Sequence, residues 1–346
     1  KKLNMSLKNL NVKIKIPKFL QKKLNNKKIN SIYSRFEKSL KINENFIVAV
    51  SGGPDSLALA FLAKIYSIKK KLKSKFFIVD HKLRPNSSIE AKNVKKVLKS
   101  NLIVSEILTW RGKKPTKNIQ SIARNKRYQL LLEQADKLKI NFILVGHHQD
   151  DLLENFFIRM LRGSGLKGLI SMDRESKIGS KNLLRPLLSE KKEDLIYLSN
   201  NVFNFYVEDP TNYDENYKRI KIRKLIETLQ INGLDKKKFI KTINNLKYSN
   251  EVVKFYVDKN LKRNTFFSKK KNQILFAKKF FLQPYEVIFR SFSDSINLIG
   301  KRYYPVRGKK LDKIINDIKK KQSFRATLGG CIIEKVNQTV IISKEH

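Results

Sequence analysis

Cysteine is nearly absent from this sequence. Cys331 is its single cysteine in 346 residues, which excludes an internal disulfide and any metal site built from several cysteines. Long apolar runs are also missing: no stretch reaches about 18 consecutive apolar residues, so the sequence predicts no membrane span. The N-terminal stretch is basic and lacks the apolar core of a signal peptide. We therefore expect a cytoplasmic protein.

Acidic residues are scarce as well. The chain has 30 Asp and Glu against 75 Lys and Arg, which gives a formal net charge of +45. A surface this basic attracts polyanions, and nucleic-acid phosphates are a common source of such attraction. AT-rich genomes also tend to encode chains rich in Lys, Asn and Ile, so drift is an alternative explanation. A small neutral substrate alone would give no reason for this charge.

Apolar residues make up 41% of the chain, enough to bury a core in two or three domains. Short β-rich runs alternate with helical patterns: strands over residues 45–50, 75–80, 101–110 and 141–148, and helices over residues 56–70, 88–100, 117–139 and 150–163. Strands and helices that alternate at this spacing predict an α/β fold with a doubly wound parallel sheet. In such sheets the functional loops follow the carboxyl ends of the strands.

The composition changes along the chain and predicts three segments. Residues 1–43 are typical of a basic arm that leads into a helix near residues 29–40, and residues 44–220 contain the α/β pattern. Residues 221–346 begin with very basic amphipathic helices and end in a small β-rich piece. We expect this last segment to bind nucleic acid through its charge.

The first predicted strand runs into the loop "SGGPDS", Ser51 to Ser56, at the start of a helix. Adjacent glycines let backbone N–H groups approach phosphate oxygens, and a helix N-terminus favours an anion. The loop lacks the lysine of a Walker A motif. Asp55 would repel phosphates unless a Mg²⁺ lay between them, so we expect it on the metal side. The alternative is a plain strand–turn–helix in which Ser and Asp cap the helix.

Two further polar groups belong to this pattern. Asp80 and His81 stand at the end of the second predicted strand, where it would meet the cleft. Arg124 and Arg127 lie three residues apart and therefore share one face of a helix. Arginine is a natural partner of phosphate, although a solvated basic face is the ordinary alternative for such a pair.

The stretch "GHHQDDLLEN" follows the fourth predicted strand. Asp151 and Glu154 share one face of the helix that it opens, and His147 lies four residues before Asp151. One interpretation is a metal site of two histidines and two carboxylates. Another is a pair of acids that complement the positive end of the helix dipole.

Taken in order, these motifs resemble the PP-loop ATP pyrophosphatases of the N type, and among them the tRNA(Ile)-lysidine synthetase family. The resemblance covers roughly residues 45–225. It is carried by S-G-G-P-D-S at 51–56, D-H-K-L-R at 80–84, A-R-N-K-R-Y at 123–128, H-H-Q-D-D-L-L-E at 147–154, R-G-S-G-L-K-G-L at 162–169, L-L-R-P-L-L at 183–188 and E-D-P-T-N at 208–212. Asn155 stands where the family usually has Thr, and Ile220 where it commonly has Asn.

The resemblance implies a role for each matching position. Binding of ATP and Mg²⁺ is implied for Ser51, Gly52, Gly53, Pro54, Asp55, Ser56, Asp80, His81 and Arg124, with Asp55 as the metal ligand. The implied catalytic residues are Asp55, Arg124, His147, Asp151 and Glu154, of which Asp151 and Glu154 would hold a substrate lysine. Contact with tRNA is expected for Arg162, Arg219, Arg223, Lys236, Lys237 and Lys238.

The reaction that the resemblance implies joins free L-lysine to C2 of the wobble cytidine of the isoleucine tRNA with anticodon CAU. It would proceed through an adenylated tRNA and convert ATP to AMP and pyrophosphate. The modified tRNA would be charged with isoleucine rather than methionine. The implied partners are the tRNA and free lysine. The sequence leaves open whether the protein forms a homodimer.

Two other functions fit parts of the sequence. A tRNA thiolation enzyme of the same superfamily would use cysteines for a persulfide or an Fe–S cluster, and the single Cys331 argues against it. A non-catalytic RNA-binding protein would fit the charge. The intact set of Asp55, Arg124, Asp151 and Glu154 argues against that alternative, because a degenerate copy should have lost at least one of them.

Overall fold

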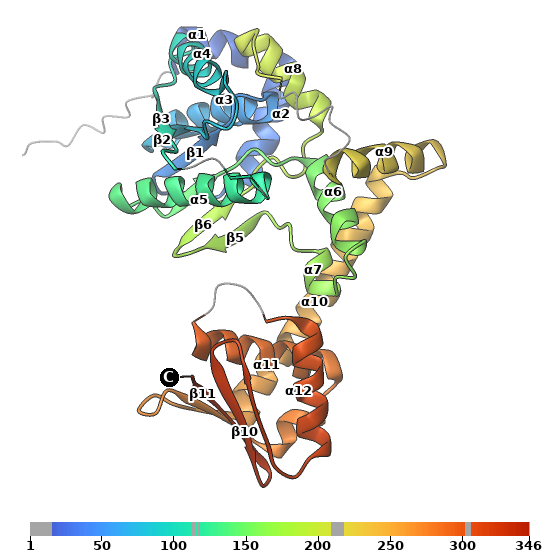
Figure 1. The fold of residues 1–346 in the computed structure, drawn as a ribbon. Helices are drawn as coiled ribbons and strands as arrows, with labels where there is room; N and C mark the ends of the chain where they lie inside the picture. The colour runs from blue at the N-terminus through green and yellow to red at the C-terminus, as the bar shows by residue number, and fades with distance from the viewer. Residues whose placement is uncertain (1–15, 113–114, 117, 209–217, 302–305, 346) are drawn as a thin grey trace, which may run out of the picture. The chain divides into compact units, whose positions relative to one another are not determined.

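The computed structural model describes residues 16–112, 115–116, 118–208, 218–301 and 306–345. The chain forms two compact units, Lys1–Asp235 and Lys236–His346 (Figure 1). The expected boundary at residue 220 falls inside helix α9 (Lys218–Ile231), and the whole of that helix belongs to the first unit. The division therefore lies after Asp235, in the short connection between two helices.

A six-stranded sheet forms the centre of the first unit, with the strand order β3-β2-β1-β4-β6-β5. The first five of these strands are parallel, and β5 pairs antiparallel with β6 at the edge. The strands are β1 (Phe46–Val50), β2 (Ser74–Asp80), β3 (Ser105–Thr109), β4 (Phe142–Leu144), β5 (Glu175–Ile178) and β6 (Lys181–Leu184). The predicted α/β class with its parallel sheet is confirmed, whereas the β5–β6 hairpin was not predicted.

Helices cover both faces of this sheet (Figure 1). Side chains alternate along a strand, so Phe46, Val48 and Val50 face one core while Ile47 faces the other. The first core also contains α1 (Lys18–Leu24), α2 (Lys27–Ser39), α3 (Pro54–Lys69), α4 (Ser87–Ser100) and α8 (Lys192–Phe203). The opposite core is closed by α5 (Ile119–Lys137). The carboxyl ends of β1, β2 and β4 are thereby held at one edge.

The N-terminal helices α1 and α2 are part of the first core. Leu20, Ile32 and Phe36 are fully buried there. Asn26 begins α2 by accepting hydrogen bonds from the N–H groups of Lys28 and Ile29. The helix expected near residues 29–40 corresponds to α2, whereas the expectation of a loose arm is wrong for α1. Residues 1–15 lie outside the described part of the chain.

The second unit combines α10 (Lys236–Asn264) with an antiparallel sheet of order β7-β8-β11-β10-β9. Its strands are β7 (Thr265–Ser268), β8 (Gln273–Phe276), β9 (Phe324–Leu328), β10 (Cys331–Val336) and β11 (Thr339–Lys344). The apolar faces of α11 (Tyr285–Gly300) and α12 (Gly308–Lys320) pack on this sheet around Phe276 and Phe292. Among the helices in the described ranges, none is both long and apolar enough to cross a bilayer.

Candidate active site

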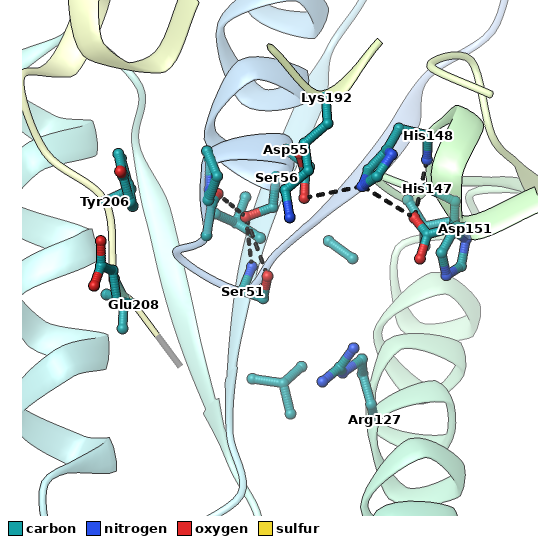
Figure 2. Close-up of a pocket in the computed structure, with 18 of the residues that line it drawn as sticks. Ser51, Asp55, Ser56, Arg127, His147, His148, Asp151, Lys192, Tyr206 and Glu208 are labelled. Carbon is teal, nitrogen blue, oxygen red and sulfur yellow. Dashed lines mark hydrogen bonds and ion pairs between the residues drawn. The ribbon is translucent and has the colours of Figure 1, made fainter. Parts of the chain in front are cut away.

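A cavity of about 580 Å³ opens at the carboxyl edge of the large sheet, at the ends of β1 and β4 (Figure 2). Its volume lies within the usual range for small-molecule sites. The walls come from the "SGGPDS" loop, the end of β4, one face of α5, the start of α8 and α9. The predicted site residues in its lining are Ser51, Gly53, Pro54, Asp55, Ser56, Arg124, His147, Asp151, Arg219 and Arg223. Motifs from Ser51 to Arg223, far apart in the sequence, thus meet at one cavity.

The "SGGPDS" loop is fastened by the hydroxyl of Ser56. Its Oγ accepts the N–H groups of Ser51 and Gly52, each at 3.1 Å, and donates to the carbonyl of Gly53 at 2.9 Å. Ser56 is only 6% exposed. We therefore assign Ser56 to holding the loop in shape, since its single proton is already donated. Gly53 lies in the open cavity wall, where nothing would stand within 4 Å of an added Cβ.

Two glycines allow the backbone to come this close. Gly52 has φ +92°, and a Cβ there would lie 2.6 Å from the Cγ2 of Val94. Gly146 follows β4, and a Cβ there would approach the Asp55 carbonyl and the Ser56 Cα at 3.1–3.2 Å. Gly52 thus requires glycine for its conformation and for space, whereas a side chain at Gly146 would require the backbone of Asp55 and Ser56 to shift by a few tenths of an ångström. Pro54 at the first turn of α3 fixes the entry of that helix.

Asp55 begins α3 and points toward the β4 side of the cavity (Figure 2). Its Oδ1 is buried with no hydrogen-bond partner, and burial raises the pKa of this carboxyl above its usual value. A cation would satisfy such an oxygen. No group of three or more His, Cys, Asp or Glu side chains gathers into a metal cage within the described ranges. With its unpaired Oδ1, Asp55 fits the way in which Mg²⁺ is usually bound, by one or two carboxylates together with substrate phosphates.

Two adjacent histidines follow β4 and have different surroundings. His147 lines the cavity, and its buried Nδ1 has no hydrogen-bond partner. Burial is the main cause that lowers the pKa of His147 to about 3, and Arg185 acts in the same direction while Asp151 opposes it. The imidazole of His147 is therefore neutral at pH 7. His148 lies between Asp55 and Asp151 (Figure 2).

Asp151 and Glu154 lie on α6 (Gln149–Met160) and face two arginines of α9. Arg223 Nε donates to Glu154 Oε1 at 2.5 Å. Arg219 lies farther away, with Nη2 at 3.5 Å from Asp151 Oδ1 and Nε at 3.4 Å from Glu154 Oε2. Burial opposes the ionisation of Asp151, but the charge of Arg219 and the hydrogen bond from the backbone N–H of His148 hold the pKa of Asp151 below its usual value.

Several predicted site residues lie outside the lining of this cavity. Asp80 is 4% exposed, and its carboxylate accepts hydrogen bonds from Lys82 N and from the hydroxyls of Ser87 and Ser88. Those bonds shape the turn before α4, and they leave little capacity for a nucleotide. His81 lies behind the wall, where Arg127 Nε approaches its Nε2 at 3.4 Å.

The remaining predicted positions are distributed more widely. Gly52 and Glu154 lie just behind the cavity lining, Arg162 is exposed after the end of α6, and Lys236, Lys237 and Lys238 open α10 in the second unit. Ile220 is buried on α9, and Asn155 donates to the hydroxyl of Ser171 at 3.2 Å. The loop of residues 209–212 falls outside the described residues.

The structure also adds residues that sequence reasoning missed. Lys192, at the start of α8, and Tyr206 line the cavity from a segment some 40 or more residues beyond the "HHQDD" motif, and so does Glu208, the first residue of the E-D-P-T-N motif (Figure 2). No local pattern marks Lys192 or Tyr206. A long-range contact holds the end of this segment at the cavity: Val207 N–H donates to the Gly52 carbonyl at 3.0 Å. The sequence could have indicated a role for His148, since this residue immediately precedes the predicted helix and its side chain can accept a hydrogen bond as an N-cap.

The family model described as a PP-loop domain matches residues 21–229. Sequence and site thus define an ATP-binding PP-loop domain. A tRNA(Ile)-lysidine synthase of Orientia tsutsugamushi is 33% identical over 88% of this chain and 70% of its own length. One from Wolbachia pipientis is 32% identical over 88% and 71%, and one from Rhodopseudomonas palustris is 36% identical over 56% and 57%. The chain belongs to the tRNA(Ile)-lysidine synthase family.

A solved structure of another PP-loop enzyme has a similar fold. The U34-tRNA thiolase NcsA from Methanococcus maripaludis, solved with its [4Fe-4S] cluster, aligns with a TM-score of 0.55. The alignment covers 65% of this chain and 79% of the thiolase, with 18% sequence identity. At that identity the likeness concerns the fold alone.

Proposed function

We propose that this protein joins L-lysine to C2 of the wobble cytidine of the isoleucine tRNA with anticodon CAU, and so forms lysidine. Membership of the tRNA(Ile)-lysidine synthase family supports the modification itself. The observation that carries the finer proposal is the buried pair Asp151 and Glu154, which lies beside the cavity that the PP-loop forms. Two carboxylates at that place suit an amine substrate next to a nucleotide.

In the first half of the reaction, ATP would lie across the "SGGPDS" loop. The C2 carbonyl oxygen of the cytidine would attack the α-phosphate, and pyrophosphate would leave. Mg²⁺, held by Asp55 and the phosphates, would supply positive charge as the leaving group forms. Arg124, Arg127 and Lys192 line the same cavity and would add fixed cations. Preorganised charges of this kind stabilise phosphoryl transfer, and positioning the cytidine lowers the barrier further.

In the second half, the lysine amine would displace AMP from the adenylated base. We infer that its ammonium takes the place of Arg219 between Asp151 Oδ1 and Glu154 Oε2. The contacts of Arg219 to those two oxygens are long, at 3.5 and 3.4 Å, and Glu154 Oε2 has no hydrogen-bond partner. Arg223 would stay on Glu154 Oε1. His147, whose Nδ1 is unpaired, would accept the proton that the ammonium loses before the amine attacks.

Residues 236–346 would supply most of the remaining tRNA contacts. Lys236, Lys237 and Lys238 open α10, and Arg219 would meet phosphate once lysine has displaced it. Single-stranded anticodon bases are usually splayed and stacked on aromatic rings. Tyr128 and Tyr206 are the aromatic residues in the described lining of the cavity, and we assign the stacking role to this pair.

A thiolation enzyme is the second candidate, because the thiolase above shares the fold. Those enzymes use cysteine chemistry, and the one cysteine of this sequence is Cys331. It is fully buried in the second unit, near the carbonyl of Ile296. Residues 1–235 therefore contain no cysteine that could act as a persulfide carrier or a thiolate cluster ligand.

Exchange of labelled pyrophosphate into ATP, with and without the tRNA, tests the first half of the proposal. We expect exchange only with the CAU tRNA present. Release of AMP should then depend on free lysine. Exchange accompanied by AMP release that does not depend on lysine would remove lysine ligation as the function and leave adenylation for another acceptor.

A further inference from the structure

His148 occupies the N-cap position of α6 and is 5% exposed. Its Nδ1 accepts the N–H of Asp150 at 3.2 Å, and its own backbone N–H donates to Asp151 Oδ2 at 3.0 Å. Because Nδ1 acts as an acceptor, the ring proton lies on Nε2. The cap thus fixes both the orientation of the ring and the position of its donor.

That donor faces two carboxylates from different helices. Nε2 lies 3.6 Å from Asp55 Oδ2, at the start of α3, and 3.6 Å from Asp151 Oδ2, on α6 (Figure 2). Both distances exceed that of a normal hydrogen bond, so the contact is electrostatic: the positive N–H edge of the ring lies at the same distance from both carboxylates. It separates the Asp55 carboxylate from that of Asp151, which would otherwise repel each other.

We propose that His148 is a positioning residue that holds Asp55 and Asp151 apart by placing the Nε2–H edge of its ring between their carboxylates. The inference rests on the proposed function, in which Asp55 serves the ATP side of the site and Asp151 the lysine side. His148 then links the two half-reactions without touching either substrate.

Helix capping alone does not explain an imidazole at this position. A cap needs one acceptor near the N–H groups of the first turn, and Ser, Thr, Asp and Asn are the usual residues. Only the ring's second nitrogen reaches both carboxylates, and it is buried against them. The two ring nitrogens of His148 therefore have different roles: Nδ1 caps α6, and Nε2 lies between the two carboxylates.

Two substitutions separate these tasks. His148→Asn keeps an acceptor near the Nδ1 position and loses the Nε2 donor, whereas His148→Gln keeps a donor near Nε2 and caps poorly. Asn26→Ala is the matched control, since it removes the cap of α2 in the same unit, away from the cavity. The readouts are the Tm, the Mg²⁺-dependent binding of a non-hydrolysable ATP analogue by calorimetry, and the KM for lysine separately from kcat.

We expect His148→Asn to keep the wild-type Tm while analogue affinity falls and lysine KM rises, each by about 10–100-fold, as when a residue that orients a ligand is lost. His148→Gln and Asn26→Ala should each lower Tm by about 2–4 °C, as the loss of a cap predicts. The Gln variant should lose less analogue affinity than the Asn variant, and the control should lose none.

Wild-type behaviour of His148→Asn in analogue affinity and lysine KM would overturn the inference. The inference would also be overturned if, in both variants, the loss of analogue affinity and the rise in lysine KM were proportional to the decrease in Tm, because the lost helix cap would then explain them. Absence of pyrophosphate exchange in the wild-type protein would instead contradict the proposed function, and the calorimetric comparison of the variants would still decide the role of His148.

Discussion

Arg223 donates to Glu154 at 2.5 Å, and the side chain of Glu154 is 3% exposed while that of Arg223 is 31% exposed. Arg223 lies on α9 and Glu154 on α6, so this ion pair joins the two helices. A second arginine of α9, Arg219, lies near the remaining oxygen of Glu154 and near Asp151. Hydrogen bonding to Glu154 raises the pKa of Arg223 further despite its burial. The sequence does not distinguish the two arginines, but their contacts do: Arg223 pairs closely with Glu154, and Arg219 makes only long contacts.

Arg223→Ala should destabilise the first unit by about 2–4 kcal/mol, because it leaves a buried carboxylate without its partner. The free energy of unfolding from urea titration measures this. Arg219→Ala is the control, since its ion pairs are long and its side chain is 39% exposed; we expect less than about 1 kcal/mol. Equal losses in the two variants would contradict the division of tasks.

Arg219→Ala should leave the lysine site open and weaken tRNA binding. We expect the KM for lysine to fall or stay unchanged, since the ammonium no longer competes with a guanidinium, while the Kd for tRNA rises several-fold through a lost phosphate contact. Steady-state kinetics and filter binding measure the two quantities. A lysine KM that rises tenfold would place the lysine elsewhere.

Asp55→Ala should reduce ATP–pyrophosphate exchange by about 100-fold or more, since the charge over the phosphates is lost. The affinity for tRNA should stay nearly the same. Glu106→Ala, an exposed acid on β3, provides a control with the same change of charge. Normal exchange by Asp55→Ala would remove Asp55 from the metal side of the nucleotide.

The stability of the first unit should fall as the pH is lowered from about 6.5 toward 4. Burial lowers the pKa of His81 to about 4 and that of His147 to about 3, from 6.5 in the unfolded chain. The unfolded chain then binds more protons throughout this interval, so the free energy of unfolding decreases with decreasing pH. In urea titrations across that range, His147→Gln should show a shallower decrease. An unchanged slope would mean that His147 titrates normally.

Replacing Lys236, Lys237 and Lys238 by Gln should weaken tRNA binding and flatten its dependence on salt. The slope of log K against log salt should become smaller by up to about three, roughly one for each lost phosphate contact. Replacing Lys269, Lys270 and Lys271 in the turn between β7 and β8 gives the same change of charge in the same unit. If both triple variants flatten the slope equally, overall charge rather than a defined contact explains the binding.

Most of the PP-loop unit was predictable because its signals are local. Alternating apolar runs predicted the strands of the parallel sheet. The motifs at strand ends predicted Asp55, His147 and Asp151, and the arginine pair on a helix predicted Arg124; the fold brings all four to one cavity. The β5–β6 hairpin escaped prediction because its strands have only four residues each and carry little apolar pattern. The buried role of α1 also escaped, since its lysines obscured two buried leucines, Leu20 and Leu24.

The pairing of α6 with α9 could not be predicted from sequence. Asp151 and Glu154 were expected to meet lysine, and Arg219 and Arg223 to meet tRNA, but nothing in the motifs indicated that the two sets face each other. Asp80 shows the opposite case. It stands at a strand end, as a site residue would, yet three hydrogen bonds within its own turn occupy it.

Mass analysis of tRNA nucleosides tests the central proposal most directly. The CAU isoleucine tRNA is incubated with the protein, ATP, Mg²⁺ and isotope-labelled lysine, then digested to nucleosides. We predict that one cytidine per tRNA, at the wobble position, gains the mass of lysine less water and carries the label, and that Glu154→Gln forms it only at much higher lysine concentration. An unmodified wobble cytidine, or a product that contains sulfur and no label, would contradict lysine ligation.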